Sequence, residues 1–230
     1  MATAQGRCDE VLERLKALGD PKNVEGMARY GIRTTKACGV STPQVRRLAR
    51  EIGRDHVLAG QLWRTGVYDA RVLAALVDDP ARVTPSQMDR WARDFDNWAV
   101  CDSVCCCLFD RTPHAWDKAV EWTGRDEEYV KRAGFVLMAA LAVHEKKAAG
   151  ERFEPFFPLM VEHAPDERNF VKKAVNWALR QIGKRNRHLN EQAIQTAERI
   201  RNLDTRSARW IAANALRELN SEKVQQRLMK

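Results

Sequence analysis

Apolar residues recur three or four positions apart along nearly the whole chain, and no segment alternates apolar and polar residues as a half-buried strand would. The spacing is clear after two Thr-Pro pairs, where the apolar positions are Val45, Leu48, Ala49 and Ile52, then Met88, Trp91, Ala92 and Phe95. Such spacing places apolar side chains on one face of a helix. The pattern therefore predicts an all-α protein of about a dozen helices with short connections.

Local signals mark where these helices start and stop. Thr-Pro pairs at 42–43, 84–85 and 112–113 predict helix starts, because a hydroxyl caps the first turn and Pro suits the first helical position. Gly53 and Gly124 are expected to end helices, since glycine adopts the capping conformation without strain. Further helices should begin near Asp126, Asp166 and Asp204.

Short sequences recur at similar separations in the second half of the chain. Val130–Ala133 (VKRA) returns as Val171–Ala174 (VKKA) after 41 residues, and Ala178–Arg180 (ALR) returns as Ala215–Arg217 after 37 residues. Matches this short also arise by chance in helical sequence. A period of about 40 residues nevertheless indicates HEAT-like helical hairpins. We predict one domain, residues 1–230, folded as a right-handed α-solenoid with a concave basic face. Repeats in phase would put Arg132 and Lys173 at equivalent places on that face.

Composition excludes several classes of protein. The first residues, MATAQGRCDE, contain no apolar segment typical of a signal peptide, and the longest apolar run, 135–143, is too short to span a bilayer. Six cysteines without an export signal favour reduced thiols in the cytoplasm. Cys105–Cys107 are consecutive and diverge around a helix, and no Cys/His quartet has zinc spacing. We expect a monomer that uses no metal, no cofactor and no membrane.

The charge balance points to a polyanionic partner. The chain has 39 Lys and Arg against 31 Asp and Glu, a net charge of +8, which favours nucleic acid. Residues 166–187 hold seven of the basic residues and only two acidic ones. Lys173, Trp177 and Arg180 share one helical face there. The alternative interpretation, a solvated helix with a basic last turn, stays open at this point.

One carboxylate stands in an apolar neighbourhood. Asp102 follows Trp98 by one helical turn, in a segment that otherwise reads as buried helix. Burying a carboxylate costs free energy unless hydrogen-bond donors compensate it, so such a residue is either paired with donors or has a functional role. Trp177 has an ionisable neighbour one turn away in the same manner, Lys173, although a core Trp beside a surface charge would look alike. The remaining tryptophans suit core positions: Trp63, Trp91, Trp116, Trp122 and Trp210.

Together these features resemble the AlkD-type DNA alkylation repair family, HEAT-like DNA glycosylases that excise alkylated purines. The resemblance covers most of the chain and is most specific at Trp98–Asp102, Lys131–Ala133 and Lys173–Arg180. It implies that Trp98, Asp102, Arg132 and Trp177 form the site that faces the lesion. It also implies duplex DNA with alkylated bases as the partner. We expect DNA contacts from Tyr30, Arg46, Arg47, Lys131, Lys172, Lys173, Arg180, Lys184, Arg185 and Arg187.

The chemistry of alkylpurine excision explains why such residues belong together. Alkylation at N3 or N7 makes the purine a cationic leaving group, and its departure leaves an oxocarbenium-like sugar. A carboxylate stabilises that charge and positions water, while indole faces attract the cationic base. The resemblance implies a duplex cradled on the concave face without a deep base pocket.

The sequence also departs from the family at three positions. Asn97 and Ala99 stand where other members carry a second Trp and an extra Asp, and Ser41 stands where Gln is expected. The alternative hypothesis is therefore a non-catalytic HEAT-repeat scaffold that binds DNA or a protein partner.

Overall fold

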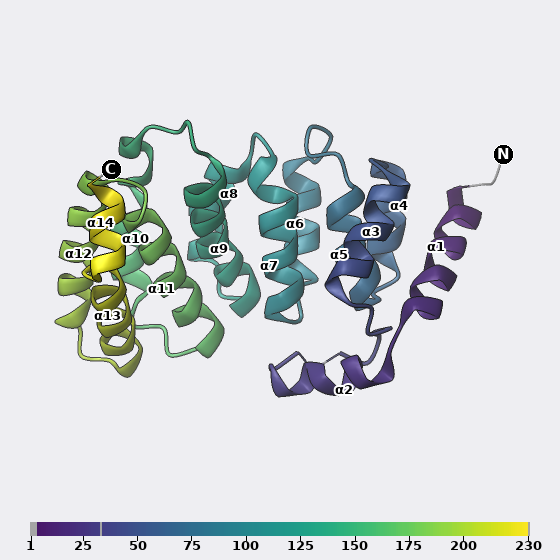
Figure 1. Cartoon of the computed structure of the whole chain (residues 1–230), viewed down its shortest axis with the longest axis horizontal. Coiled ribbons are helices and arrows are strands. Elements are labelled where there is room, and N and C mark those ends of the chain that lie inside the picture. The colour runs from purple at the N-terminus through teal and green to yellow at the C-terminus, as the bar shows by residue number, and fades with distance from the viewer. Residues whose placement is uncertain (1–3, 33, 230) are drawn as a thin grey trace. The chain divides into compact units, whose positions relative to one another are not determined.

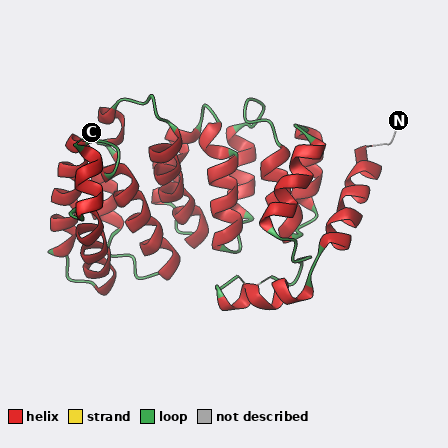
Figure 2. Ribbon diagram, viewed as in Figure 1, coloured by secondary structure: helices red, strands yellow, loops and turns green. Residues whose placement is uncertain are grey.

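The computed structural model describes residues 4–32 and 34–229, and in those residues every regular element is a helix (Figures 1 and 2). The all-α prediction is confirmed. The chain divides into two compact units, Met1–Pro113 and His114–Lys230. The prediction that residues 1–230 form a single domain stays a prediction. Within the described chain, no helix has both the length and the apolar character needed to cross a bilayer.

Unit 1 contains seven α-helices and one 3-10 helix in its described residues: α1 (Ala4–Leu18), α2 (Pro21–Arg29), α3 (Thr42–Ile52), α4 (His56–Arg64), α5 (Tyr68–Val77), α6 (Pro85–Arg93), α7 (Trp98–Cys107) and η1 (Phe109–Arg111). Helix α5 contacts α3, α4 and α7 and so forms the centre of the unit. The core includes stacked indole rings of Trp63 and Trp91, with centroids 4.0 Å apart. Helix α2 has no buried residue.

Unit 2 repeats a helix-pair arrangement through its described residues: α8 (Ala115–Glu121), η2 (Trp122–Gly124), α9 (Glu128–His144), η3 (Gly150–Phe153), α10 (Phe156–His163), α11 (Asn169–Gly183), α12 (Arg187–Arg201), α13 (Arg206–Leu219) and α14 (Glu222–Leu228). Helices α8, α10 and α12 each contact the helix that follows, and α11 contacts both α9 and α13. The second helices of successive pairs therefore form one layer, as the repeat of about 40 residues predicted.

The predicted helix boundaries are mostly confirmed. Thr84 caps α6, and its hydroxyl accepts a hydrogen bond from the Gln87 amide at 3.2 Å. Gly53 ends α3 with a positive φ of 73°. Helices α9, α11 and α13 begin two or three residues after the predicted Asp positions. Helix α3 starts one residue earlier than expected, because Ser41 is its N-cap and Thr42 is already helical.

The third Thr-Pro pair was wrongly predicted to start a helix. The Thr112 hydroxyl donates a 2.8 Å hydrogen bond back to the Phe109 carbonyl and closes η1, and α8 begins only at Ala115. The expected stop at Gly124 ends the 3-10 helix η2 instead of an α-helix. Both segments use 3-10 turns, whose short range gives no periodic signal in the sequence.

The core prediction for the tryptophans was wrong at one position. Trp63, Trp91 and Trp122 are buried, and Trp116 packs against Phe153 and Phe156, whereas Trp210 is 37% exposed. The buried stripe of α13 is formed by Ser207, Ala208, Ile211, Ala212, Ala215 and Leu219. Trp210 falls between successive turns of that stripe and so faces outward.

Candidate functional site

A side-chain cap sets the register of α7. The Asn97 side-chain oxygen accepts hydrogen bonds from the backbone amides of Ala99 and Val100, both at 3.0 Å, and Asn97 itself is buried. Asparagine is among the preferred N-cap residues because it satisfies amides that the first turn leaves free. The departure from the family at position 97 thus has a structural role here: it makes Trp98 the first residue of the helix and puts Asp102 one turn later.

The Trp98 ring is held by a backbone group from another part of unit 1. Its indole Nε1–H donates a 2.8 Å hydrogen bond to the carbonyl of Tyr30, the residue that caps the C-terminus of α2. The Tyr30 side chain is 72% exposed. The structure therefore brings two of the predicted residues together, Tyr30 through its backbone and Trp98 through its ring.

Asp69 and Asp78 are two of the three buried carboxylates in the described residues of unit 1, and both have hydrogen-bond donors around them. Asp69 accepts hydrogen bonds from the amides of Cys38 at 2.6 Å and Val40 at 2.8 Å, and it fixes the segment that leads into α3. Asp78 accepts a hydrogen bond from the side-chain amide of Gln87 at 2.7 Å and lies 2.6 Å from a ring nitrogen of His56. Both carboxylates are structural, because internal donors compensate their burial.

Asp102 differs from these two because it is only half-buried. It lies between Trp98 and Cys106 on one face of α7, each one turn away. Burial raises the pKa of the Cys106 thiol, and the negative charge of Asp102 raises it further. A thiol held neutral in this way is unreactive, so the face presents a single charged group, Asp102.

The cysteines of α7 behave as small apolar residues. Cys101 and Cys105 are buried, and all six cysteines of the chain are free thiols. In the described parts of the chain, no three His, Cys, Asp or Glu side chains are grouped so that they could hold a metal ion.

Arg132 lies in the interior of unit 2. Its side chain on α9 is only 5% exposed, and Nη1 donates a 2.6 Å hydrogen bond to the Phe170 carbonyl in α11. Lys173, its predicted counterpart on α11, is exposed. The two residues therefore differ in burial although they match in the repeat.

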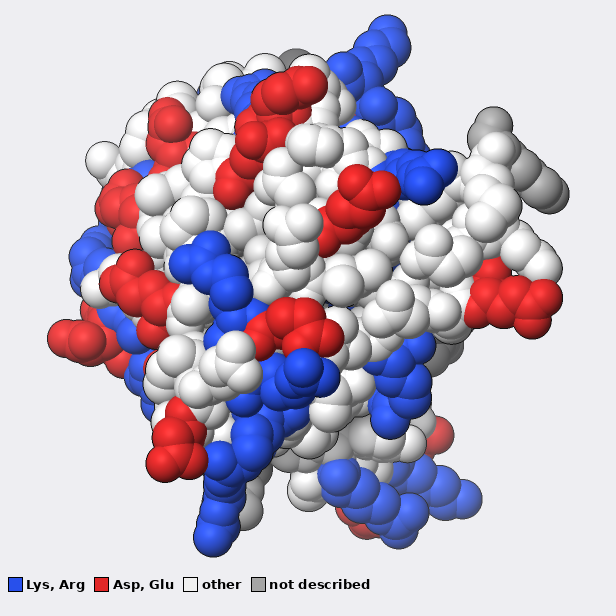
Figure 3. Space-filling model, turned by 90° about the vertical axis from the view of Figure 1, so that its left-hand side faces the viewer, with Lys and Arg blue, Asp and Glu red and all other residues white. Residues whose placement is uncertain are grey.

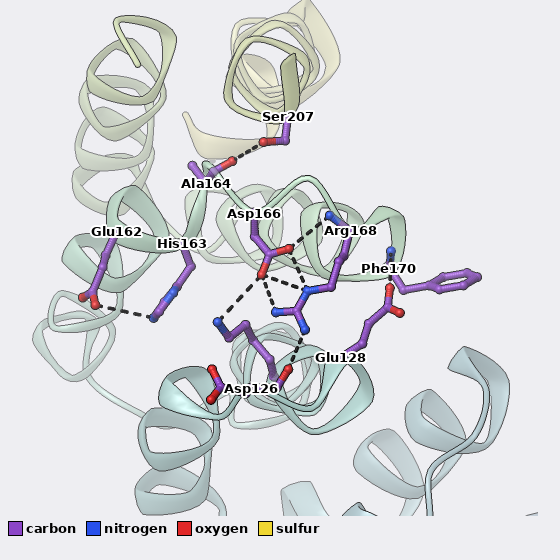
Figure 4. Close-up of polar contacts among 10 residues, drawn as sticks. Asp126, Glu128, Glu162, His163, Ala164, Asp166, Arg168, Phe170 and Ser207 are labelled. Carbon is purple, nitrogen blue, oxygen red and sulfur yellow. Dashed lines mark hydrogen bonds and ion pairs between the residues drawn. The ribbon is translucent and has the colours of Figure 1, made fainter. Parts of the chain in front are cut away.

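Lys131 faces a cluster of polar groups at the start of α9 and α11. Figure 4 shows Asp166, in the loop before α11, facing the Arg168 guanidinium, and Lys131 Nζ lies 3.7 Å from Asp166. Burial opposes ionisation of Asp166, but the hydrogen bonds from Arg168 outweigh it and lower its pKa. Arg168 also donates to the Asp126 carbonyl at 2.5 Å. Lys131 thus forms part of a contact that joins α9 to α11.

The basic residues near the end of α11 have protein partners. Glu218 of α13 accepts hydrogen bonds from Arg180 and from Lys184, the latter at 2.5 Å. Arg185 donates to the carbonyls of Ala142, Glu145 and Ala148 at 2.6–3.0 Å, where α9 ends. These contacts satisfy helix-terminal carbonyls, so Arg185 has a structural role in unit 2.

Other predicted contact residues are accessible. Arg46 and Arg47 are exposed on α3, and Arg47 is paired with Glu51 at 3.0 Å. Arg187 is exposed beside Glu191. Lys172 and Trp177 are half-buried on α11.

Sequence reasoning missed Trp210 as a functional candidate. Lys172 Nζ lies 5.7 Å from the centroid of the Trp210 ring. The signal was available in the sequence, since Arg206, Arg209 and Arg217 share a side of α13 with Trp210. Figure 3 shows Lys and Arg side chains interspersed with Asp and Glu side chains over the face that it draws.

Comparisons with known proteins identify the family and the fold. The model of a family described as DNA alkylation repair enzyme matches residues 11–219. No curated protein matches the chain. A solved structure covers 96% of this chain and 95% of its own at 21% identity, with a TM-score of 0.77. It is described as a new family of proteins related to the HEAT-like repeat DNA glycosylases with affinity for branched DNA structures. The predicted HEAT-like fold is confirmed.

Proposed function

Because the chain belongs to the family of DNA alkylation repair enzymes, we propose that it hydrolyses the N-glycosidic bond of cationic N3- or N7-alkylated purines in duplex DNA. The observation that carries this proposal is the partial exposure of Asp102 one turn after Trp98, on a helix that contains no other Asp, Glu, Lys or Arg. Asp69 and Asp78 are buried among internal donors, whereas Asp102 is half-buried.

The proposed reaction needs only these groups, water and the substrate. The bond between C1′ and the purine nitrogen breaks, and its electron pair leaves with the base and cancels the positive charge there. The Asp102 carboxylate stabilises the oxocarbenium-like sugar that forms. Water then adds to C1′ and loses a proton, with Asp102 as the acceptor, to give an abasic site and a neutral free base. The Trp98 indole, held by the Tyr30 carbonyl, covers the cationic base.

The residues of unit 2 are assigned supporting roles. Trp177 supplies a second indole from α11. Arg132, buried in unit 2, acts as a positioning residue: its bond to the Phe170 carbonyl holds α11, the helix that carries Trp177. The exposed Lys173 and Arg187 contact the DNA backbone. We propose that the protein acts on DNA as a monomer in the cytoplasm.

Release of free base tests this proposal. Purified protein is incubated with duplex DNA methylated at N3 of adenine and N7 of guanine, and the released bases are separated chromatographically. We expect methylpurines to be released at a rate proportional to the concentration of the protein. No bases should be released from unmethylated DNA of the same sequence. Methylated DNA that keeps its bases while it is bound by the protein contradicts the glycosylase proposal.

That second outcome corresponds to a non-catalytic DNA-binding protein, the alternative function. The observation that favours it is the solved structure of similar fold, whose family has affinity for branched DNA. Ser41 is also engaged in a capping box with Gln44, where an active member is expected to carry Gln. Binding to junction DNA without base release supports this alternative.

A further inference from the structure

The exposed side of α13 combines one large aromatic ring with arginines. Arg206, Arg209, Trp210, Ala213 and Arg217 are all exposed, and they recur at the spacing of one helical face. The opposite side of α13 is buried against α11 and α12. Trp210 is 37% exposed and lies outside the buried stripe of α13, and a partly exposed indole ring among cations suits a ligand with a flat π face.

We propose that Trp210 is a stacking platform for an unpaired DNA base, with the surrounding Lys and Arg side chains on the flanking phosphates. The proposal rests on the DNA-binding part of the proposed function and does not require catalysis. It identifies the substrate class as DNA with unpaired bases, such as the arms or branch point of a forked duplex.

The charges around Trp210 fit a polyanion. Helices α11 and α13 together carry six Lys or Arg residues and a single carboxylate, Glu218. Glu218 is neutralised by Arg180 and Lys184. Asp204, which precedes α13, is paired with Arg209 at 2.9 Å. Lys172 lies next to the Trp210 ring, and Arg206 and Arg217 precede and follow Trp210 along α13, an arrangement that suits a nucleic-acid strand passing over the ring.

Trp210 also continues a row of equivalent positions. The 37-residue repeat aligns the exposed Lys173 of α11 with Trp210 of α13, whereas the matching position one repeat earlier, Arg132 of α9, is buried. Because α11 contacts both α9 and α13, these positions follow one another across the layer of second helices. A strand held by Lys173 can therefore reach Trp210 on the next helix.

The ring selects unpaired bases over paired ones. In a duplex the faces of each base are covered by its neighbours, so contacts to it are made through phosphates and groove edges. An unpaired base offers a free face, and stacking on an aromatic side chain tolerates any base. Lys172 near the Trp210 ring adds a positive charge next to the stacked base.

The test compares two DNA probes of equal length on the full chain. One is a forked duplex with unpaired thymine arms, and the other is fully paired; binding is followed by fluorescence anisotropy. Trp210→Ala should weaken binding to the forked probe roughly 5- to 150-fold, the range for loss of one stacked base, and leave the paired probe unchanged. Trp210→Phe should retain most of the preference. Val120→Ala, which truncates another exposed apolar side chain of unit 2, serves as the control and should change the affinity for neither probe.

A second measurement separates stacking from charge. Trp210→Ala removes no charge, so the slope of log K against log[salt] should stay the same. Oligothymidylate should quench the tryptophan fluorescence of Trp210→Phe less than that of the wild type. Equal affinity of Trp210→Ala for the forked probe, with melting unchanged, overturns the inference. If Trp210→Ala changes the sedimentation coefficient of the protein but not its DNA affinity, this face of α13 contacts protein, and the inference is overturned as well. Absence of base release with an intact preference for the fork refutes only the glycosylase proposal.

Discussion

The indole nitrogen of Trp98 lies 2.8 Å from the carbonyl oxygen of Tyr30 and donates a hydrogen bond to it. This bond connects the first residue of α7 with the end of α2, a helix that has no buried residue of its own. The contact therefore fixes the ring and also attaches the α2 terminus to the helix that carries Asp102.

Trp98→Phe should weaken excision without unfolding the protein. Phenylalanine keeps an aromatic face but loses the N–H, and a hydrogen bond of this kind contributes about 0.5–1.5 kcal/mol. We expect base release to fall roughly 2- to 10-fold as the ring loses its fixed orientation. Single-turnover base release together with thermal melting checks this. A rate equal to that of the wild type would show that the Tyr30 contact does not orient the ring for catalysis.

Asp102→Asn should abolish most excision and preserve binding. The amide keeps the shape of the side chain but removes the charge, and loss of a positioned electrostatic group costs about 10²–10³ in rate. Duplex affinity should hold or rise slightly, since a negative charge near the phosphates is gone. Base release, duplex binding and melting are measured on one preparation.

Asp69→Asn is the matched control for that experiment. Asp69 is buried and accepts three backbone amides, so its neutralisation should destabilise unit 1 by about 1–3 kcal/mol and lower binding and excision in proportion. If Asp102→Asn behaves like Asp69→Asn, Asp102 is structural and the catalytic assignment fails.

Lys173 and Arg185 should respond differently to neutralisation although both lie in the basic segment of unit 2. Lys173→Gln removes an exposed charge, so the slope of log K against log[salt] for duplex DNA should fall by about 0.9 with no change in melting. Arg185→Gln leaves carbonyls at the end of α9 without donors and should lower the melting temperature. Identical salt slopes for Lys173→Gln and the wild type would remove Lys173 from the interface.

The sequence predicted the helices and the α7 motif because both depend on local pattern. Periodicity and capping residues define α6 and the end of α3, and the spacing of Trp98 and Asp102 places both on one face of α7. The departure at Asn97 looked like a lost functional residue until the structure showed it as the cap of α7.

Partners that are distant in the chain could not be predicted in this way. Arg132 and Lys131 are adjacent basic residues in the sequence, and only the packing of α9 on α11 gives one the Phe170 carbonyl and the other Asp166. Asp69 is satisfied by amides about 30 positions earlier, a relationship without any local signal. The exposure of Trp210 was predictable in principle, because the apolar stripe of α13 leaves it out.

Glu218 makes the contact between α11 and α13 depend on pH. Burial opposes ionisation of Glu218, but the hydrogen bonds from Lys184 and Arg180 outweigh it and lower its pKa below the ordinary value of 4.5. A carboxyl with a lowered pKa in the folded protein contributes stability that is fully present above the unfolded value and is lost as the pH falls through the folded value. The contribution should therefore be complete at neutral pH and disappear below about pH 4.5.

Glu218→Gln tests this through the free energy of unfolding in urea at several pH values. At pH 7 the variant should be less stable than the wild type by about 1–2 kcal/mol, because two charge-assisted hydrogen bonds are weakened at a partly exposed site. The difference should shrink as the pH falls below 4.5. Glu191→Gln, in the exposed pair with Arg187, is the control and should change stability by at most about 0.5 kcal/mol. A difference for Glu218→Gln that is the same at pH 7 and at pH 3.5 would show that its ionisation does not hold α11 and α13 together.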